Sequence, residues 1–153
     1  MELEGLKIRS FSEKKEALNK DYSLLEQLVQ ELQNRELPPE VVVELNEEIF
    51  RLNAVSDHDL KLNFYVRLVK KKVLETLHND LEIVPKNYYR NLWSALGMSV
   101  FGIPLGIILS AILDNTASIA IGLPIGLAIG LAVGTEMDKR SLENNKQLEF
   151  EIN

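Results

Sequence analysis

Apolar residues in the N-terminal half of the chain recur at helical spacing and predict a first helix over about residues 11–34. The seam repeats about every 3.5 residues, which is typical of a helix that packs along another helix. The seam residues are Phe11, Leu18, Tyr22, Leu25, Val29 and Leu32. Ser10 and Glu13 have the spacing of a capping box at the start of this helix.

Two further helices are predicted before the most apolar part of the chain. Pro38-Pro39 starts one of them, because a proline suits the first helical turn and Glu40 suits the positive end of the helix dipole. Ser56 and Asp59 predict the start of the next helix, which ends near Asn79. The expected buried residues are Val42, Leu45, Ile49 and Leu52, then Leu62, Val66, Val69, Val73 and Leu77. Short connections favour antiparallel neighbours, so we expect a three-helix bundle, or a long hairpin that completes its core by oligomerising.

The stretch 91–135 carries one charged residue, Asp114, and predicts two membrane spans, over about 92–113 and 117–135. The first span has 22 residues, so at ~1.5 Å each it is roughly 33 Å long, enough for a ~30 Å hydrocarbon core. The predicted fold class is an all-α membrane protein. Its expected parts are a cytoplasmic helical domain (1–84), a transmembrane hairpin (85–140) and a cytoplasmic tail (141–153).

Residues that favour the membrane–water interface flank both spans. Tyr and Trp prefer the headgroup region, and Lys and Arg mark the cytoplasmic side. The interface anchors are Lys86, Tyr88, Tyr89, Arg90, Trp93, Lys139 and Arg140. The turn between the spans has no basic residue, so both termini are predicted to be cytoplasmic.

Small residues recur every fourth position in the spans and predict a helix-packing interface. Apolar burial does not drive helices together in lipid, whereas glycines let two backbones approach closely. The row consists of Ser118, Gly122, Gly126, Gly130 and Gly134 in the second span and Gly102, Gly106 and Ser110 in the first. We expect the hairpin to self-associate through this row.

The two spans also align with each other at a distance of twenty residues, with Pro104 matching Pro124, as in an internal duplication. Each proline removes a helical hydrogen bond and predicts a kink. The kinks either shape the packing or mark a permeation path.

The second span GLPIGLAIGLAVG and its exit T-x-M-D-K-R-S-x-E-x-x-x-Q-L resemble uncharacterised bacterial two-span glycine-zipper membrane proteins. The segment VPKNYYRNLWSALGMSVFGIPLG is similar to theirs as well, so the resemblance covers about residues 84–148. It implies the cell inner membrane of a bacterium and no particular activity.

Composition excludes several classes of function. The chain has no cysteine, which excludes disulfides and thiolate chemistry, and it shows no phosphate-binding loop or zinc-ligand spacing. We therefore expect no catalytic, cofactor or metal site. A net charge of −6 also argues against nucleic-acid binding. The basic residues Arg67, Lys70, Lys71 and Lys72 are either the usual flank of a membrane span or a patch that binds lipid or a partner.

The two ends of the chain show a period-two alternation typical of strands. Leu6 and Ile8 alternate with basic residues, and Leu148, Phe150 and Ile152 alternate with acidic ones. Because both ends are expected on one side of the membrane, they are candidates for a short β-ribbon, the alternative being two frayed ends.

The sequence therefore predicts a non-enzymatic integral membrane protein that self-associates through its hairpin. The cytoplasmic helices would assemble the oligomer or bind a cytoplasmic protein partner. A membrane-perturbing or pore-forming effector triggered through the cytoplasmic domain is the first alternative. A small oligomeric channel or transporter is the second.

Overall fold

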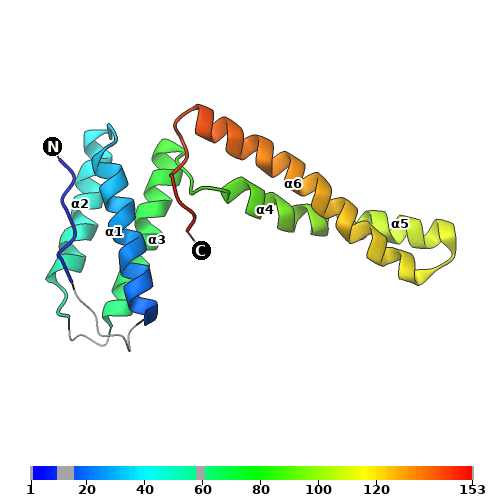
Figure 1. Ribbon diagram of the computed structural model, residues 1–153, viewed down its shortest axis with the longest axis horizontal. Coiled ribbons are helices and arrows are strands. Elements are labelled where there is room, and N and C mark those ends of the chain that lie inside the picture. Colours follow the sequence, from blue (N-terminus) through cyan, green and yellow to red (C-terminus); the bar gives the residue numbers. More distant parts are fainter. Residues whose placement is uncertain (1, 10–15, 58–60, 153) are drawn as a thin grey trace. The chain divides into compact units, whose positions relative to one another are not determined.

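The computed structural model describes residues 2–9, 16–57 and 61–152. The chain divides into two compact units, Met1–Glu82 and Ile83–Asn153, and each is treated by itself below. Within the described residues the regular secondary structure is helical, which confirms the all-helical prediction (Figure 1). The expected caps at Ser10, Glu13 and Asp59, and the seam residue Phe11, lie outside the described part of the chain.

The first unit is a bundle of α1 (Glu16–Gln33), α2 (Pro39–Ala54) and α3 (Leu62–Leu81). As predicted, α2 begins at the second proline of the Pro-Pro pair. Both α1 and α2 pack on α3. The predicted seams are buried at every described position, namely Leu18, Tyr22, Leu25, Val29, Leu32, Val42, Leu45, Ile49, Leu52, Leu62, Val66, Val69, Val73 and Leu77. The unit thus fills its core with three helices of its own, as the bundle interpretation requires.

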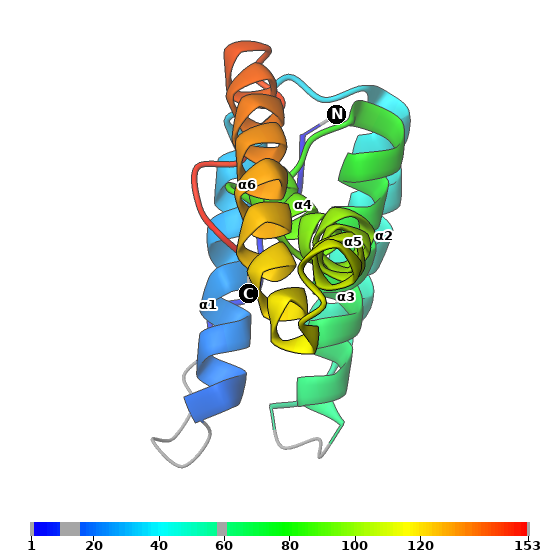
Figure 2. The same ribbon diagram turned by 90° about the vertical axis from the view of Figure 1, so that its right-hand side faces the viewer.

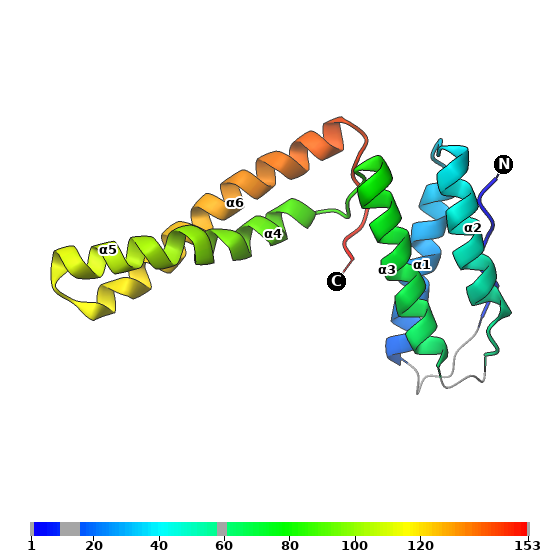
Figure 3. The same cartoon turned by 180° about the vertical axis from the view of Figure 1, so that it is seen from behind.

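Residues 2–9, which we call the N-terminal strap, run in an extended conformation alongside α2 and α1 (Figures 1 and 3). The strap is hydrogen-bonded to both helices, through Asn46 and Asn53 of α2 and through Gln33 of α1. It forms no strand, so its backbone groups depend on helix side chains for their partners.

The second unit is a helical hairpin. Its first leg consists of α4 (Tyr88–Leu96), a π-helical segment (Gly97–Gly102) and α5 (Ile103–Leu113), and its second leg consists of a 3₁₀ turn (Thr116–Ser118) and α6 (Ile119–Glu143). Figure 2, which views the hairpin from its turn, shows the two legs crossing. Asp114 ends the first leg in the left-handed region with φ 45°. The Asn115 side chain then accepts the N–H of Ala117 at 3.0 Å, so the predicted polar turn is present.

The candidate β-ribbon between the termini is wrong, because the described residues of neither end form a strand. The tail instead meets the segment before the first leg: Val84 N–H donates to Lys146 O at 3.0 Å, and Leu148 N–H donates to Val84 O at 2.9 Å. The physical reason is topological, because a hairpin brings the residues before its first leg beside those after its second. The alternation also failed for the strap, in which Ile8 is 91% exposed instead of sharing a buried face with Leu6.

Candidate functional site

The glycines of α6 lie against the backbone of the first leg of the same hairpin. Gly122, Gly126, Gly130 and Gly134 are all buried. A Cβ added at Gly134 would lie 2.5 Å from the Tyr89 carbonyl oxygen, whereas ordinary contact begins at 3.4 Å. The other three glycines are as tightly confined by backbone atoms. Only glycine permits this approach of the two legs, because any larger residue would place its Cβ within the backbone of the opposite leg.

The first leg presents its own row, and that row begins one glycine earlier than expected. Gly97, Gly102 and Gly106 are buried and face α6. Gly97 and Gly102 are five residues apart, which in an α-helix would place them roughly 140° apart around the axis. The π-helical segment, in which Ile103 N–H donates to the Met98 carbonyl, brings both onto the same face.

The predicted site also includes two serines and two prolines. Ser118 is buried at the start of α6, whereas Ser110 is only half-buried and its carbonyl accepts the N–H groups of Asp114 and Asn115 at the turn. Pro104 lies directly after the π-helical segment, inside a leg that is helical from Tyr88 to Leu113, and it has no N–H to donate within that leg. Pro124 lies inside α6.

The outer surface of the hairpin is built from large apolar side chains. Both legs, at 26 and 28 residues, are long and apolar enough to cross a membrane, and only 17% and 28% of their most apolar stretches are buried. Exposed examples are Val100, Phe101, Ile103, Ile107, Ile108, Ile112, Ile119, Ile121, Ile125 and Ile129. The hairpin is thus inverted relative to a soluble helix pair, with its smallest residues inside and its largest apolar residues outside.

Asp138 joins the legs at the open end of the hairpin. It lies four residues beyond Gly134 on the same face of α6 and is 7% exposed. Its two carboxylate oxygens accept the N–H groups of Tyr89 at 3.0 Å and Arg90 at 2.9 Å, in the first turn of α4. A carboxylate in this position satisfies free amides and matches the positive end of the helix dipole. The sequence analysis assigned no role to Asp138, although the residue continues the four-residue spacing of the glycines.

The predicted interface anchors gather at this same open end. Tyr88 and Tyr89 make an edge-to-face contact with ring centroids 5.1 Å apart. Lys139 and Arg140 are exposed and pair along α6 with Glu143 at 3.9 Å and Glu136 at 3.3 Å. The remaining three are placed nearby in the chain: Lys86 in the segment before α4, and Arg90 and Trp93 within α4.

The four basic residues of α3 all make ion pairs with acidic residues of the bundle. Lys70 and Arg67 contact Asp21 of α1, at 2.5 and 2.7 Å. Burial acts to raise the pKa of Asp21, but the hydrogen bonds and charges of Lys70 and Arg67 outweigh it, so the pKa lies below its ordinary value. Lys71 pairs with Glu75 at 3.4 Å and Lys72 with Glu48 at 3.3 Å. The contacts with Asp21 and Glu48 join α3 to other helices, whereas the Lys71–Glu75 pair lies within α3. All four pairs reduce the charge that a lipid or a partner would meet.

Two asparagines of α2 bind the backbone of the N-terminal strap. Asn46 accepts the N–H of Glu4 at 2.8 Å and donates to the carbonyl of Glu2 at 3.1 Å. Asn53 repeats the arrangement three strap residues later, with Lys7 N–H at 2.8 Å and the Gly5 carbonyl at 3.1 Å. Sequence analysis missed both asparagines, since their signal is only a seven-residue spacing.

Arg9 ends the strap in a closed cage, and its side chain is fully buried. The guanidinium donates to the carbonyls of Leu52 and Val55, at 2.9 and 2.8 Å, and pairs with Asp57 at 2.5 Å. It lies 5.8 Å from the ring centroid of Tyr22, a cation–π geometry. Burial raises the pKa of Tyr22, so the phenol keeps its proton and donates to the Lys7 carbonyl at 2.6 Å.

Comparison with known proteins yields no family model, no curated protein and no solved structure that matches this chain. Within the described residues, no cluster of His, Cys, Asp and Glu has the geometry to hold a metal ion. The functional argument therefore rests on the hairpin and on the bundle with its strap.

Proposed function

We propose that the protein is a non-enzymatic membrane anchor that presents a helical binding domain. In this proposal the unit Ile83–Asn153 crosses the bilayer twice, and the unit Met1–Glu82 binds a cytoplasmic partner. The inverted construction of the hairpin carries the proposal. Apolar surface costs about 25 cal/mol per Å² in water, and soluble monomers rarely expose large contiguous patches of it. Lipid chains around the outer faces remove that cost.

The residues at the two polar ends of the hairpin also support a hairpin that crosses the bilayer twice. The turn at Asp114–Thr116 has no basic residue, while the aromatic and basic anchors collect at the open end. This asymmetry favours a cytoplasmic open end, in the inner membrane of a bacterial cell as the family resemblance implies. Both termini would then lie in the cytoplasm.

Self-association belongs to the proposal, but through a different surface from the expected one. The two legs cover each other's glycines, so a second copy would meet the glycine row only after the hairpin opened. The exposed apolar faces stay available in the closed hairpin. We therefore assign oligomer contacts in the membrane to the outer faces.

Alkaline carbonate extraction of membranes from cells that express the full chain tests the anchor. We expect the protein to stay in the membrane pellet and to be released by detergent. Replacing the exposed Ile103 and Ile125 by Lys adds about 2.5–3.5 kcal/mol per charge at mid-span and should abolish stable insertion. The matched control replaces Phe50 and Phe64, which are exposed on the bundle, by Lys and should stay in the pellet. Release of the unaltered chain by carbonate alone would overturn the proposal.

A membrane-potential dye separates the anchor from its alternatives. Induced expression of an anchor should leave the potential unchanged. Depolarisation at matched expression levels would instead favour the pore-forming effector or the channel.

A further inference from the structure

We propose that the seam between α1 and α2 is a recognition groove for an extended peptide segment of a partner protein. The matching segment carries an apolar residue, a second apolar residue three positions later and an arginine three positions after that. The strap occupies the groove in the structure. This inference deepens the proposed function, on which its biological meaning rests, by stating which surface of the bundle binds the partner.

The groove lies where the backbones of α1 and α2 approach each other less closely than each approaches α3. Each packs on α3, but no α-carbon of α1 lies within 8 Å of an α-carbon of α2 in these two described helices. The strap bridges them, with Gln33 of α1 donating to the Leu3 carbonyl at 3.0 Å and the two asparagines of α2 holding its other edge. The strap, a short extended segment, therefore lies between α1 and α2 and hydrogen-bonds to both.

Recognition of the backbone is periodic and independent of the peptide's sequence. Asn46 and Asn53 are two helical turns apart on one face of α2, a rise of about 10.5 Å. Three residues of an extended polyproline-type chain advance about 9 Å, which matches that separation. Each asparagine binds the carbonyl of one strap residue and the N–H of the residue two positions later. Any extended chain offers the same pairs of groups.

Side-chain recognition follows the same three-residue period. Leu3 is 8% exposed, Leu6 is half-buried and the Arg9 side chain is fully buried in its cage. The residues between them face outward, and Ile8 is 91% exposed. A period of three is that of a polyproline-type helix, which presents one residue in three to a groove. The groove thus accepts two apolar residues and an arginine at fixed spacing and leaves the intervening positions free.

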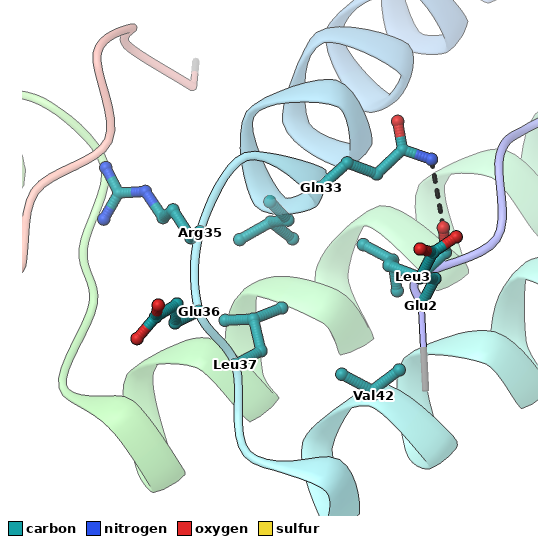
Figure 4. Close-up of a pocket in the computed structure, with 8 residues that line it drawn as sticks. Glu2, Leu3, Gln33, Arg35, Glu36, Leu37 and Val42 are labelled. Carbon is teal, nitrogen blue, oxygen red and sulfur yellow. Dashed lines mark hydrogen bonds between the residues drawn. The ribbon is translucent and has the colours of Figure 1, made fainter.

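The strap leaves part of the groove unfilled, so a competing peptide can make additional contacts there. A cavity of about 410 Å³ opens beside Leu3, between the C-terminal end of α1, the following loop and the start of α2 (Figure 4). It is lined by Glu2, Leu3, Leu32, Gln33, Arg35, Glu36, Leu37 and Val42. At the other end, the buried Nε of Arg9 has no hydrogen-bond partner among the described residues. A partner segment with a larger residue at the first position would make contacts that the strap does not make.

Because the strap is tethered, it competes at a high effective concentration and keeps the groove closed to weak ligands. Weakening the strap without touching the groove should therefore uncover binding. The variant is the full chain with Leu3→Ala and Arg9→Ala, purified in detergent. The probe is a fluorescent synthetic peptide of residues 2–9, followed by fluorescence anisotropy. We expect it to bind this variant at least about tenfold more tightly than it binds the unaltered chain.

Two altered peptides and one altered chain test whether the binding is specific. A peptide with Ile8→Ala should bind equally well, because that side chain faces solvent, and a peptide with Arg9→Ala should lose binding. Adding Asn46→Ala and Asn53→Ala to the strap-weakened chain should also abolish binding. Circular dichroism establishes that each chain remains helical, and light scattering gives its oligomeric state.

Several results would overturn the groove. One is a folded strap-weakened chain that binds no peptide, and another is equal binding of all three peptides. Loss of the bundle's helical signal in the strap-weakened chain would show that the strap is an indispensable part of the core. A change from dimer to monomer without peptide binding would assign the groove to the strap of a second copy. All of these measurements are made in detergent, so their outcome does not depend on the result of the carbonate test of the anchor.

Discussion

The substitution Gly130→Ala tests whether backbone contact between the two legs holds the hairpin closed. The new Cβ would lie 2.8 Å from the Trp93 carbonyl carbon and 3.1 Å from the Gly97 α-carbon, and closer still to the Trp93 oxygen. Ordinary contact begins at 3.4 Å, so the legs must separate by more than about 0.6 Å, enough to lose a quarter or more of the dispersion energy at neighbouring contacts. Overpacking of this kind costs about 1–3 kcal/mol. Alanine recovers up to about 1 kcal/mol through its higher helix propensity.

Because the new Cβ meets backbone, which cannot move aside, the overpacking cost lies at the upper end of that range, and we expect Gly130→Ala to destabilise the hairpin by about 2 kcal/mol. The chain has a single tryptophan, Trp93, whose carbonyl meets this glycine, so its fluorescence reports the opening of the seam directly. Emission and thermal unfolding are measured on the full chain in detergent. Ala128→Leu, which adds bulk to an exposed position of α6, is the matched control and should change neither. An unaltered Trp93 emission and unfolding temperature in Gly130→Ala would refute the close-packed seam.

Three further outcomes are expected. Asp138→Ala should leave two amides at the start of α4 without a partner, costing about 1–3 kcal/mol and speeding their hydrogen exchange; unchanged exchange would mean that Asp138 does not cap α4. A cysteine introduced at Asn115 should react with an impermeant thiol reagent in intact cells, whereas one at Ser141 should not, and the reverse pattern would invert the topology. Asp21 has a lowered pKa in the folded state, so its stabilising effect is present above its ordinary pKa of 3.8 and is lost as the pH falls through the lower folded value. Asp21→Asn should accordingly lower the unfolding temperature at neutral pH, and the difference should close in acid; a difference that persists in acid would contradict this account.

Most of the fold could be predicted from periodic features of the sequence. Seams such as Leu18, Leu25 and Leu32 specify a buried helix face because burial must recur with the helical repeat. The glycine row of α6 was visible for the same reason, and its four-residue spacing does place it on one buried face. What the spacing leaves open is which helix covers that face. Here the first leg of the same hairpin does so.

Features that depend on single hydrogen bonds were not predictable. Arg9 looked like an outward-facing residue of a strand, yet it is buried because carbonyls, Asp57 and Tyr22 together replace its hydration. The capping role of Asp138 likewise depends on which backbone amides the folded hairpin brings to it. Such hydrogen-bond partners are distant in the chain, so neither composition nor periodicity predicts which residues will pair. The strap's period of three was present in Leu3, Leu6 and Arg9, but three positions are too few to distinguish it from a period of two.

The π-helical segment has a consequence for the tolerance of this hairpin to changes in length. The interval from Gly97 to Gly102 holds one residue more than the interval from Gly102 to Gly106, and the wide helical turn takes up the difference. Deleting Ser99 would set the first two glycines four apart, the spacing that an ordinary α-helix already places on one face. The leg could then shed its π turn and keep every glycine opposite α6, whereas a deletion between Gly102 and Gly106 would rotate Gly106 out of the seam. The six residues of the π-helical segment thus tolerate a one-residue deletion that the rest of the first leg does not tolerate.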